Sequence, residues 1–435
     1  MERQIISKLL EWKQSPDRKP LILKGARQVG KTYILREFGR KYYKNVAYIN
    51  CDHNELARDL FKQDFDMRRV LLNIEAITRE HIVAGETLII LDEIQELEYG
   101  LAALKYFCED VPEQHVAVAG SLLGIALHKS SSFPVGKVDF LQMSPMNYEE
   151  FLLAMGEKKL CDILRRQKWT DILPLRKKYI EFLRQYYYVG GMPAVVASYV
   201  AKHNLAEVRR LQNGIVESYR NDISKHTSAG ETKRINMVLD SIPSQLAKEN
   251  KKFVFGALKK GGRAKDFEIA IQWLVDCGIV HKVSRISSPT MPLSFYEDVG
   301  AFKLYLLDLG LMGSIAEVPA AQFITLDNGF KEFKGAFTEQ YVLQQLMSAG
   351  GNSVYYFSNE TSTLEIDFVV QKGNGIFPIE VKAEENLRSK SLRNYCTTNK
   401  NLRGIRFSMS DYRDQGWMTN IPLYAALPWA EERDA

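Results

Sequence analysis

A glycine-rich loop near the start of the chain combines residue types that can hold a nucleotide phosphate. Residues 21–32 read Leu-Ile-Leu-Lys-Gly-Ala-Arg-Gln-Val-Gly-Lys-Thr, an apolar strand that runs directly into the pattern Gly-x-x-x-x-Gly-Lys-Thr. Glycines at these positions let successive backbone N–H groups curl closely around the β- and γ-phosphates. Lys31 would bring a positive charge to the phosphates, and Thr32 would offer a hydroxyl to Mg²⁺ at the N-terminus of the following helix. The residues that we expect to contact ATP are Gly25, Ala26, Arg27, Gln28, Val29, Gly30, Lys31, Thr32 and Tyr33.

Two adjacent carboxylates form a second motif. Residues 87–93 read Thr-Leu-Ile-Ile-Leu-Asp-Glu, which is typical of a buried parallel strand that ends in acidic residues. We expect Asp92 to hold Mg²⁺ through water and Glu93 to orient or deprotonate the attacking water. Downstream of a phosphate-binding loop, this acidic motif of Walker B form predicts ATP hydrolysis as well as ATP binding, with Lys31 and Glu93 in catalytic roles.

A third strand pattern, residues 116–120, leads to Ser121. AAA-type ATPases carry a small polar sensor group at this place, where it touches the γ-phosphate or the attacking water, so Ser121 is a further catalytic candidate. The same serine could instead be the N-cap of a helix that begins at Leu122, because a serine hydroxyl satisfies free backbone N–H groups there. Both interpretations stay open.

The composition is typical of a soluble enzyme with more than one domain. A chain of 435 residues exceeds one ordinary domain and favours about three. No run reaches the roughly 18 apolar residues of a membrane span, and the first residues begin an amphipathic helix rather than a signal peptide. We therefore expect no membrane partner and a cytoplasmic location. The five cysteines are scattered without C-x-x-C spacing, which argues against a zinc site or a disulfide framework. The net charge of +5 is mild, so only local clusters of basic residues could bind nucleic acid.

Hydrophobic patterns divide the chain into four predicted domains. Strand and helix patterns alternate up to about residue 140, which predicts an α/β fold with the doubly wound parallel sheet of a P-loop NTPase. Residues 148–226 have a helical pattern rich in Lys, Arg and Tyr, broken at Gly190-Gly191-Met192-Pro193, and we interpret them as a helical lid. Its basic residues are interpreted as a solvated helix face, with nucleic-acid contact as the alternative. The predicted domains are 1–145 (ATPase), 146–230 (helical lid), 231–318 (winged-helix-like) and 319–435 (nuclease-like).

The predicted winged-helix module rests on the order of its elements. Helical patterns on both sides of Lys259-Lys260-Gly261-Gly262-Arg263 are followed by two strand-like runs, residues 279–283 and 302–306. Helix, turn, helix and β-wing in this order describe a winged helix. If the module binds DNA, Lys259, Lys260, Arg263 and Lys265 lie where phosphates would be met. Winged helices also act as protein–protein spacers in ATPases, so a protein partner is the alternative.

A second set of chemically capable residues lies near the C-terminus. Glu339 falls in a helical pattern, Asp367 in a strand pattern, and Glu380 with Lys382 in the next strand. The two strands are joined by the turn at residues 372–375, so Asp367 and Glu380 can face each other and coordinate a divalent cation. Lys382 points to the same face and could orient the nucleophile or stabilise developing charge. This pattern predicts a nuclease-type α/β core. Phosphodiester cleavage by these four residues is a separate, open question, and solvated charges on a strand pair are the alternative.

With these motifs, the chain resembles the bacterial and archaeal AAA-type ATPases that join an N-terminal ATPase module to a C-terminal domain of unknown function with a PD-(D/E)xK restriction-endonuclease-like core. The resemblance implies ATP binding and an AAA-like fold, with winged-helix and nuclease-like parts behind it. The segments that stand where this family has its hallmarks are residues 19–32, Leu91-Asp92-Glu93-Ile94-Gln95, Gly120-Ser121, Gly190-Gly191-Met192-Pro193 and Ile379-Glu380-Val381-Lys382.

Two positions depart from the family's pattern. Gly136-Lys137 stands where members commonly have Gly-Arg, and a lysine cannot bind phosphate in the bidentate way of a trans-acting arginine finger. Oligomer-dependent hydrolysis is therefore open, and Arg27, Lys137 and Arg220 are equal candidates for contact with the γ-phosphate. The nuclease-like motif has Ile366-Asp367 in place of a literal Pro-Asp pair.

Three functions fit these observations. The first is an ATP-dependent enzyme that binds or processes DNA, whose nucleotide state controls its C-terminal domains, and it predicts ATP turnover that DNA stimulates. The second is a regulatory switch ATPase whose C-terminal domains bind a protein partner, so that DNA changes nothing. The third is a metal-dependent nuclease gated by the ATPase, which requires that Glu339, Asp367, Glu380 and Lys382 function together. We favour the first, because two modules usually associated with nucleic acid accompany the ATPase motifs, and its DNA half rests on fold analogy.

Overall fold

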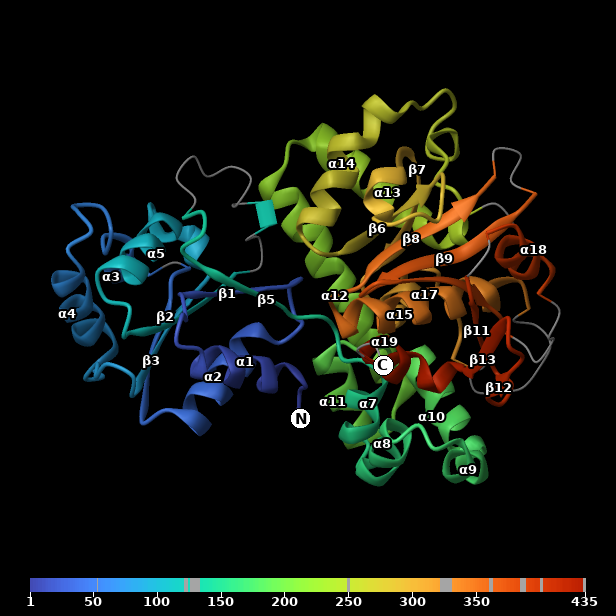
Figure 1. Ribbon diagram of the computed structural model, residues 1–435. Coiled ribbons are helices and arrows are strands. Elements are labelled where there is room, and N and C mark those ends of the chain that lie inside the picture. The colour runs from blue at the N-terminus through green and yellow to red at the C-terminus, as the bar shows by residue number, and fades with distance from the viewer. Residues whose placement is uncertain are drawn as a thin grey trace. The chain divides into compact units, whose positions relative to one another are not determined.

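The computed structural model describes residues 1–52, 54–120, 124–125, 134–248, 251–320, 331–359, 363–383, 389–399 and 402–432. The chain divides into two compact units, whose elements Figure 1 labels. One unit consists of Glu2–Ser144 with Asp276–Gly278, and the other of Met1, Pro145–Val275 and Ile279–Ala435. No helix in the described part of the chain is long and apolar enough to span a membrane.

The N-terminal unit is built on a five-stranded sheet in which every pair of neighbouring strands runs parallel. Across the sheet the order is β2-β3-β4-β1-β5. The central strands are rich in Ile, Leu, Val and Ala and are buried, as a sheet covered on both faces requires. This arrangement confirms the predicted α/β class with a parallel sheet. The strands are β1 (Leu21–Lys24), β2 (Asn45–Asn50), β3 (Thr87–Asp92), β4 (His115–Ala119) and β5 (Asp139–Gln142).

Helices cover both faces of this sheet. On one face, Ile89 and Leu91 belong to a core that also contains Val70 and Ile74 of α4 and the apolar side of α5. On the other face, α2 lies so close that a Cβ on Gly39 would come within 2.5 Å of Val46 Cγ2. A glycine is therefore needed where this helix crosses the sheet. The helices are α1 (Ile5–Gln14), α2 (Lys31–Tyr42), α3 (Glu55–Arg58), α4 (Met67–Thr78), α5 (Gly100–Glu109) and the 3-10 helix η1 (Ile94–Glu96).

The second unit begins with the predicted helical region. The break between α10 and α11 falls at the Gly-Gly-Met-Pro sequence, where the Asp308 carboxylate accepts a hydrogen bond of 2.6 Å from Gly191 N and one of 3.0 Å from Leu311 N. A Cβ on Gly190 would lie 2.4 Å from the same carboxylate, so a side chain cannot be placed there. The helices are α7 (Tyr148–Ala154), α8 (Lys158–Arg165), α9 (Trp169–Ile172), η2 (Leu173–Leu175), α10 (Arg176–Val189), α11 (Pro193–Lys202) and α12 (Leu205–His226).

The elements predicted as a winged helix follow in the expected order. Strands β6 (Val280–Ile286) and β7 (Glu297–Leu306) pair antiparallel. However, β6 also pairs in parallel with β8 (Ser353–Ser358), so the hairpin continues the C-terminal sheet. The assignment as a winged helix stays a prediction. The remaining elements of this region are α13 (Ala229–Leu246), η3 (Phe255–Ala257), α14 (Ala264–Asp276), η4 (Leu293–Tyr296) and α15 (Leu309–Ile315).

An eight-stranded mixed sheet organises the C-terminal part, with β12 and β7 at its two edges (Figure 1). The order is β12-β13-β11-β10-β9-β8-β6-β7. Strands β9 and β10 form the predicted hairpin, in which Lys372 pairs with Gly375. Helix α17 packs against β10, and α18 packs against β9, β10 and β11. The further elements are β9 (Glu365–Lys372), β10 (Gly375–Val381), β11 (Gly404–Ser408), β12 (Arg413–Asp414), β13 (Met418–Pro422), α17 (Lys331–Ala349), α18 (Lys390–Thr398), η6 (Leu423–Ala425) and α19 (Ala426–Glu431).

Candidate functional site

The phosphate-binding loop connects β1 to α2 at the carboxyl edge of the N-terminal sheet. Strand β4 separates β1 from β3, which carries Asp92, and Ala119 of β4 lies opposite both Leu23 and Asp92. The ends of three neighbouring strands thus bring the glycine-rich loop and the acidic motif to one edge of the sheet. The carboxyl edge of a parallel α/β sheet is where such folds bind their ligands.

The backbone of the loop explains its glycines. Gly25 has a φ of +149°, and a Cβ there would lie 2.3 Å from the carbonyl oxygen of Met143. Gly30 and Gln28 also have positive φ angles, +96° and +67°. Glycine adopts such conformations without steric cost. The spacing of the glycines therefore has a geometric reason in the loop itself.

Lys31 is buried at the start of α2, with only 7% of its surface exposed. Its Nζ donates hydrogen bonds of 2.8 Å to the carbonyl oxygens of Gly25 and Ala26. Burial lowers the pKa of Lys31 to about 8, against the opposing effect of the Glu93 and Asp92 carboxylates. A buried ammonium group whose hydrogen-bond acceptors are neutral carbonyls is suited to receive an anion.

Thr32 and Asp92 meet directly. Thr32 Oγ1 donates a hydrogen bond of 2.6 Å to Asp92 Oδ2, and the Tyr48 hydroxyl donates to the same oxygen at 3.2 Å. Burial and the nearby Asp92 carboxylate raise the pKa of Tyr48 to about 12, so this hydroxyl stays protonated and can donate. Threonine hydroxyl and carboxylate oxygens are ligands that suit Mg²⁺, and this pair fits a nucleotide-bound magnesium ion.

Glu93 is turned away from the line of its strand. Its φ of +54° is left-handed, and Gln95 Nε2 donates a hydrogen bond of 2.6 Å to Glu93 Oε2. The left-handed conformation costs a residue other than glycine roughly 1–2 kcal/mol. Such conformations are concentrated at functional sites, where the surrounding structure maintains them. Because of this conformation, Glu93 does not continue β3, which ends at Asp92.

Arg3 supports the loop from outside the sequence motifs. Its guanidinium group donates hydrogen bonds to the carbonyl oxygens of Val29, at 3.1 Å, and of Ser144, at 2.7 Å. It therefore ties the phosphate-binding loop to the end of this unit. Sequence reasoning missed Arg3, because a lone arginine ahead of an amphipathic helix carries no motif.

The remaining predicted nucleotide contacts are placed as follows. Arg27, Gln28 and Tyr33 are exposed. Lys137 forms an ion pair of 2.9 Å with Glu109, and Arg220 forms one of 2.8 Å with Asp240. The predicted sensor Ser121 lies outside the described residues. The roles of all predicted site residues stay predictions.

The C-terminal strands bring three of the predicted nuclease residues together. Asp367 of β9 accepts a hydrogen bond of 2.8 Å from Val381 N of β10. Lys382 Nζ lies 3.2 Å from Glu380 Oε1, and burial raises the pKa of Glu380. Arg406 of β11 is paired in register with Glu380. The facing carboxylates expected from the hairpin are thus present, together with two neighbouring cations.

The fourth residue, Glu339 of α17, meets a lysine that the sequence did not suggest. Its carboxylate forms an ion pair with Lys251, and the Tyr305 hydroxyl donates to Glu339 Oε2 at 3.3 Å. Lys251 Nζ also lies 3.9 Å from Asp367 Oδ1. Among the residues that the structure describes, no group of three or more His, Cys, Asp or Glu side chains is arranged to hold a metal ion. Nothing in the sequence links Lys251 to a glutamate 88 positions away.

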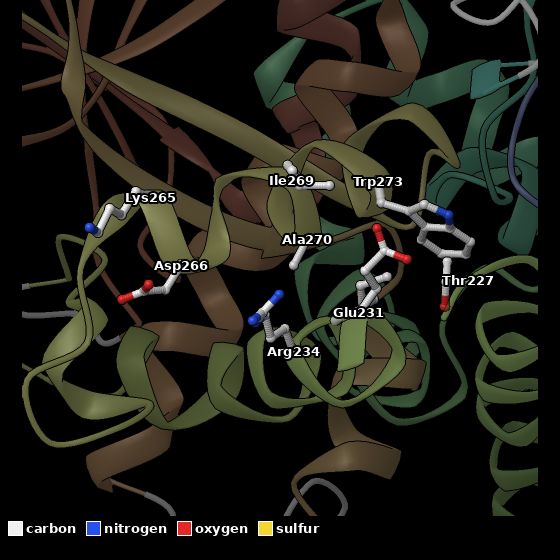
Figure 2. A pocket seen from close by; sticks show the side chains of 9 residues that line it. Thr227, Glu231, Arg234, Lys265, Asp266, Ile269, Ala270 and Trp273 are labelled. Atoms are coloured by element: carbon white, nitrogen blue, oxygen red, sulfur yellow. The ribbon is translucent and has the colours of Figure 1, made fainter. Parts of the chain in front are cut away.

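A pocket lies between α13 and α14, in the region predicted to contact DNA. Figure 2 shows Lys265 and Asp266 at one end, Trp273 and Thr227 at the other, and Arg234 between them. Its charged side chains are of both signs, so the pocket itself has no excess positive charge. The residues that line it are Thr227, Glu231, Arg234, Ile235, Lys265, Asp266, Ile269, Ala270 and Trp273.

Three sequence families match successive parts of the chain. Residues 17–152 match the family described as an AAA domain, and residues 180–322 and 334–425 match two domains of unknown function, DUF8612 and DUF4143. A comparison with curated proteins found no matching relative. Residues 17–152 contain both motifs of the candidate ATP site. This part of the chain therefore matches an AAA domain and has the parallel sheet and motifs of a P-loop NTPase core.

Several solved structures are similar over most of the chain at low identity. The Walker-type ATPase PABY2304 of Pyrococcus abyssi is 14% identical, with a TM-score of 0.45, and the match covers 72% of this chain and 95% of that one. The Aeropyrum pernix ORC1 protein in complex with DNA is 16% identical, with a TM-score of 0.27 and coverage of 74% and 93%. The Thermotoga maritima RuvB Holliday junction branch migration motor is 14% identical, with a TM-score of 0.28 and coverage of 65% and 89%. TM-scores of this size do not establish a shared overall fold.

Proposed function

We propose that the chain is a Mg²⁺-dependent ATP hydrolase that acts on DNA, or is regulated by it, through its second unit. The observation that carries the ATPase half is the hydrogen bond of 2.6 Å from Thr32 to Asp92. This contact joins the hydroxyl of the phosphate-binding loop to the carboxylate of the acidic motif, as a shared magnesium site requires. The match of residues 17–152 to an AAA domain supports the same assignment.

In this proposal, the loop binds ATP by exchanging its own hydrogen bonds for bonds to phosphate. Lys31 would turn its ammonium group from the Gly25 and Ala26 carbonyls to phosphate oxygens, which compensate the charge better. The backbone N–H groups of residues 25–33 and the N-terminus of α2 would complete the anion site. Thr32 and Asp92 would hold Mg²⁺, which supplies positive charge to the β- and γ-phosphates when bound.

Hydrolysis in this proposal depends on Glu93. Glu93 follows Asp92 in sequence at the edge of the sheet. Gln95 Nε2 donates a hydrogen bond to Glu93 Oε2 and holds this carboxylate oxygen in place. The Glu93 carboxylate can accept a proton from the attacking water or orient that water for in-line attack. Ser121 is proposed as the group that senses the γ-phosphate, and Arg27, Lys137 and Arg220 remain the candidates for an additional phosphate contact.

The DNA half of the proposal rests on exposed basic side chains near α14. Lys259, Lys260, Arg263 and Lys265 are all exposed, over the turn before α14 and its first residues. Clustered lysines and arginines meet phosphates without regard to base sequence. ATP would favour one conformation of the protein over another, and the two conformations would bind DNA with different affinities. The bound nucleotide would therefore change the affinity of this region for DNA.

The test is Mg²⁺-dependent ATP turnover by the purified chain, with duplex DNA, with single-stranded DNA and without DNA. Lys31→Ala serves as the blank. We expect turnover that stops in Lys31→Ala and rises when DNA is added. Turnover in wild type that DNA leaves unchanged would refute the DNA half while the ATPase half stands.

A regulatory switch that binds a protein partner is the second candidate. It is favoured by the mixed charges of the α13–α14 pocket and by Ile269, whose surface is 71% exposed beside Asp266 and Glu268 on the same helix. Carboxylates beside an apolar side chain suit a protein surface better than a phosphate backbone. In this case DNA would not change ATP turnover. Ile269→Asp would abolish binding of the protein partner.

A further inference from the structure

The carboxylates of the C-terminal cluster already have cationic partners within the chain. Glu339 pairs with Lys251, Glu380 pairs with Lys382, and Lys251 also reaches Asp367. Next to them, buried Lys303 of β7 forms an ion pair of 2.5 Å with Glu365 of β9. The cluster therefore extends over α17 and at least three strands, and an ammonium or guanidinium group stands beside each carboxylate.

The formal charges of this cluster balance without a metal ion. Arg406 is fully buried beside Glu380, and the Glu380 carboxylate acts on it electrostatically. Adding a divalent cation would leave two uncompensated positive charges in a largely buried place, which is costly. The four negative groups are Glu339, Glu365, Asp367 and Glu380, and the four positive groups are Lys251, Lys303, Lys382 and Arg406.

Lys251 has the position that matters for a metal. A divalent cation in a nuclease of this type is held between carboxylates from different elements. Here Lys251 Nζ contacts both Glu339 of α17 and Asp367 of β9, and only 17% of its side chain is exposed. Lys251 comes from the segment after α13, outside the sheet and outside α17. This cation of the cluster thus comes from a part of the second unit other than the elements that carry the carboxylates.

We propose that Lys251 is a built-in counter-cation that takes the place of a divalent metal between Glu339 and Asp367, so that the C-terminal core binds no catalytic metal. The nuclease-like residues then serve as the anchor of the segment between α13 and β6. This inference does not depend on the ATPase assignment, because all of its residues lie in the second unit.

The first test counts Mn²⁺ bound to the full, nucleotide-free chain by electron paramagnetic resonance. We compare wild type, Asp367→Asn, Lys251→Met and the double variant. Wild type and Asp367→Asn should bind Mn²⁺ alike, and Lys251→Met should gain a site at least about tenfold tighter than any in wild type, since two carboxylates lose their cation. The double variant should lose that site again.

Two results would overturn the proposal. One is a Mn²⁺ site in wild type that Asp367→Asn removes. The other is a Lys251→Met protein that has a native circular dichroism spectrum and cooperative unfolding but gains no site.

A second measurement needs no substitution at Lys251. Acetylation by an N-hydroxysuccinimide ester, followed by peptide mass spectrometry, should modify Lys251 more slowly than the exposed Lys259 and Lys260, and Glu339→Gln should speed that reaction. Mn²⁺ should leave the rate at Lys251 in wild type unchanged. Equal rates at all three lysines, or faster labelling of Lys251 with Mn²⁺, would contradict the proposal.

Discussion

The two charged sites of this molecule combine the same groups in opposite ways. At the edge of the N-terminal sheet, Lys31 donates to neutral carbonyls, and Asp92 accepts from neutral hydroxyls. In the C-terminal cluster, Lys251 bonds directly to a carboxylate. A lysine and an aspartate that are kept from neutralising each other can receive a phosphate and a metal ion. A lysine and carboxylates that neutralise each other need no ligand.

The two sites differ because their charged residues come from different kinds of segments. Lys31 lies at the start of α2 and Asp92 at the end of β3, and Asp92 accepts a hydrogen bond from the neutral Thr32 hydroxyl. The C-terminal cluster receives a cation from a segment that is distant in sequence. A sequence motif alone therefore does not show whether a site is ready for a ligand.

The largest expected effect is the loss of Lys31. Lys31→Ala should lower ATP turnover at least about 100-fold, because preorganised positive charge on the transferred phosphoryl group is removed. Steady-state turnover measures this effect. Lys41→Ala changes an exposed lysine on the same helix and should keep turnover close to wild type. A similar loss of ATP turnover in both variants would refute the role of Lys31 in phosphate binding.

Replacement of Glu93 should separate binding from chemistry. Glu93→Gln should lower turnover about 10²-fold while ATP still binds, because an amide cannot accept the proton of the attacking water. Single-turnover hydrolysis and equilibrium binding of a fluorescent ATP analogue measure the two steps. Glu96→Gln, an exposed residue of the same turn, is the matched control. Loss of nucleotide binding in Glu93→Gln would assign this residue to the binding site instead.

The pH dependence of ATP binding should report the buried lysine. Burial lowers the pKa of Lys31 to about 8 in the free protein, and the protonated amine binds phosphate. Affinity should therefore be insensitive to this group below pH 8 and should fall by up to about tenfold per pH unit above it. Equilibrium binding between pH 7 and pH 9.5 measures this.

The same shift has a consequence for stability with the opposite sign. Between about pH 8 and the ordinary lysine pKa near 10.4, the unfolded chain holds a proton that the folded chain has released. Lys31 therefore makes the nucleotide-free N-terminal unit more stable as the pH rises through this window. Lys31→Arg stays charged throughout, so a variant with the same pH profile as wild type would exclude Lys31 as the titrating group.

The smallest expected effect concerns Arg3. Arg3→Ala removes two hydrogen bonds to the carbonyl oxygens of Val29 and Ser144, and should lower the free energy of unfolding of the N-terminal unit by about 1–3 kcal/mol. Urea unfolding measures the change. Lys8→Ala, an exposed residue of α1, is the control. Equal stability of the two variants would show that Arg3 does not hold the loop.

The N-terminal fold could be predicted from the sequence because its signals are local. The apolar strands at residues 21–24 and 87–92 and the glycine pattern between strand and helix each lie within a few neighbouring residues, and the parallel sheet confirms the predicted class. The hairpin that carries Asp367 and Glu380 was equally readable, since its two-residue turn fixes the register.

Long-range pairing could not be predicted in the same way. The strand pattern at residues 279–283 gives no indication that β6 pairs with β8, which begins about seventy residues later, and thereby joins the C-terminal sheet. The sequence predicts a helix break at the glycines of residues 190 and 191, but it does not show that these glycines make room for the buried carboxylate of Asp308. Lys251 carried no signal at all, because an isolated lysine acquires its partner only through the tertiary fold.

The most direct test of the contrast between the two sites is the number of Mn²⁺ ions bound tightly per chain in the presence of a non-hydrolysable ATP analogue, measured by electron paramagnetic resonance. We expect one tightly bound ion that requires the nucleotide, that Asp92→Asn removes and that Asp367→Asn leaves in place. A tightly bound ion that persists without nucleotide and disappears in Asp367→Asn would contradict the account, because it would place the metal in the cluster that Lys251 is proposed to close.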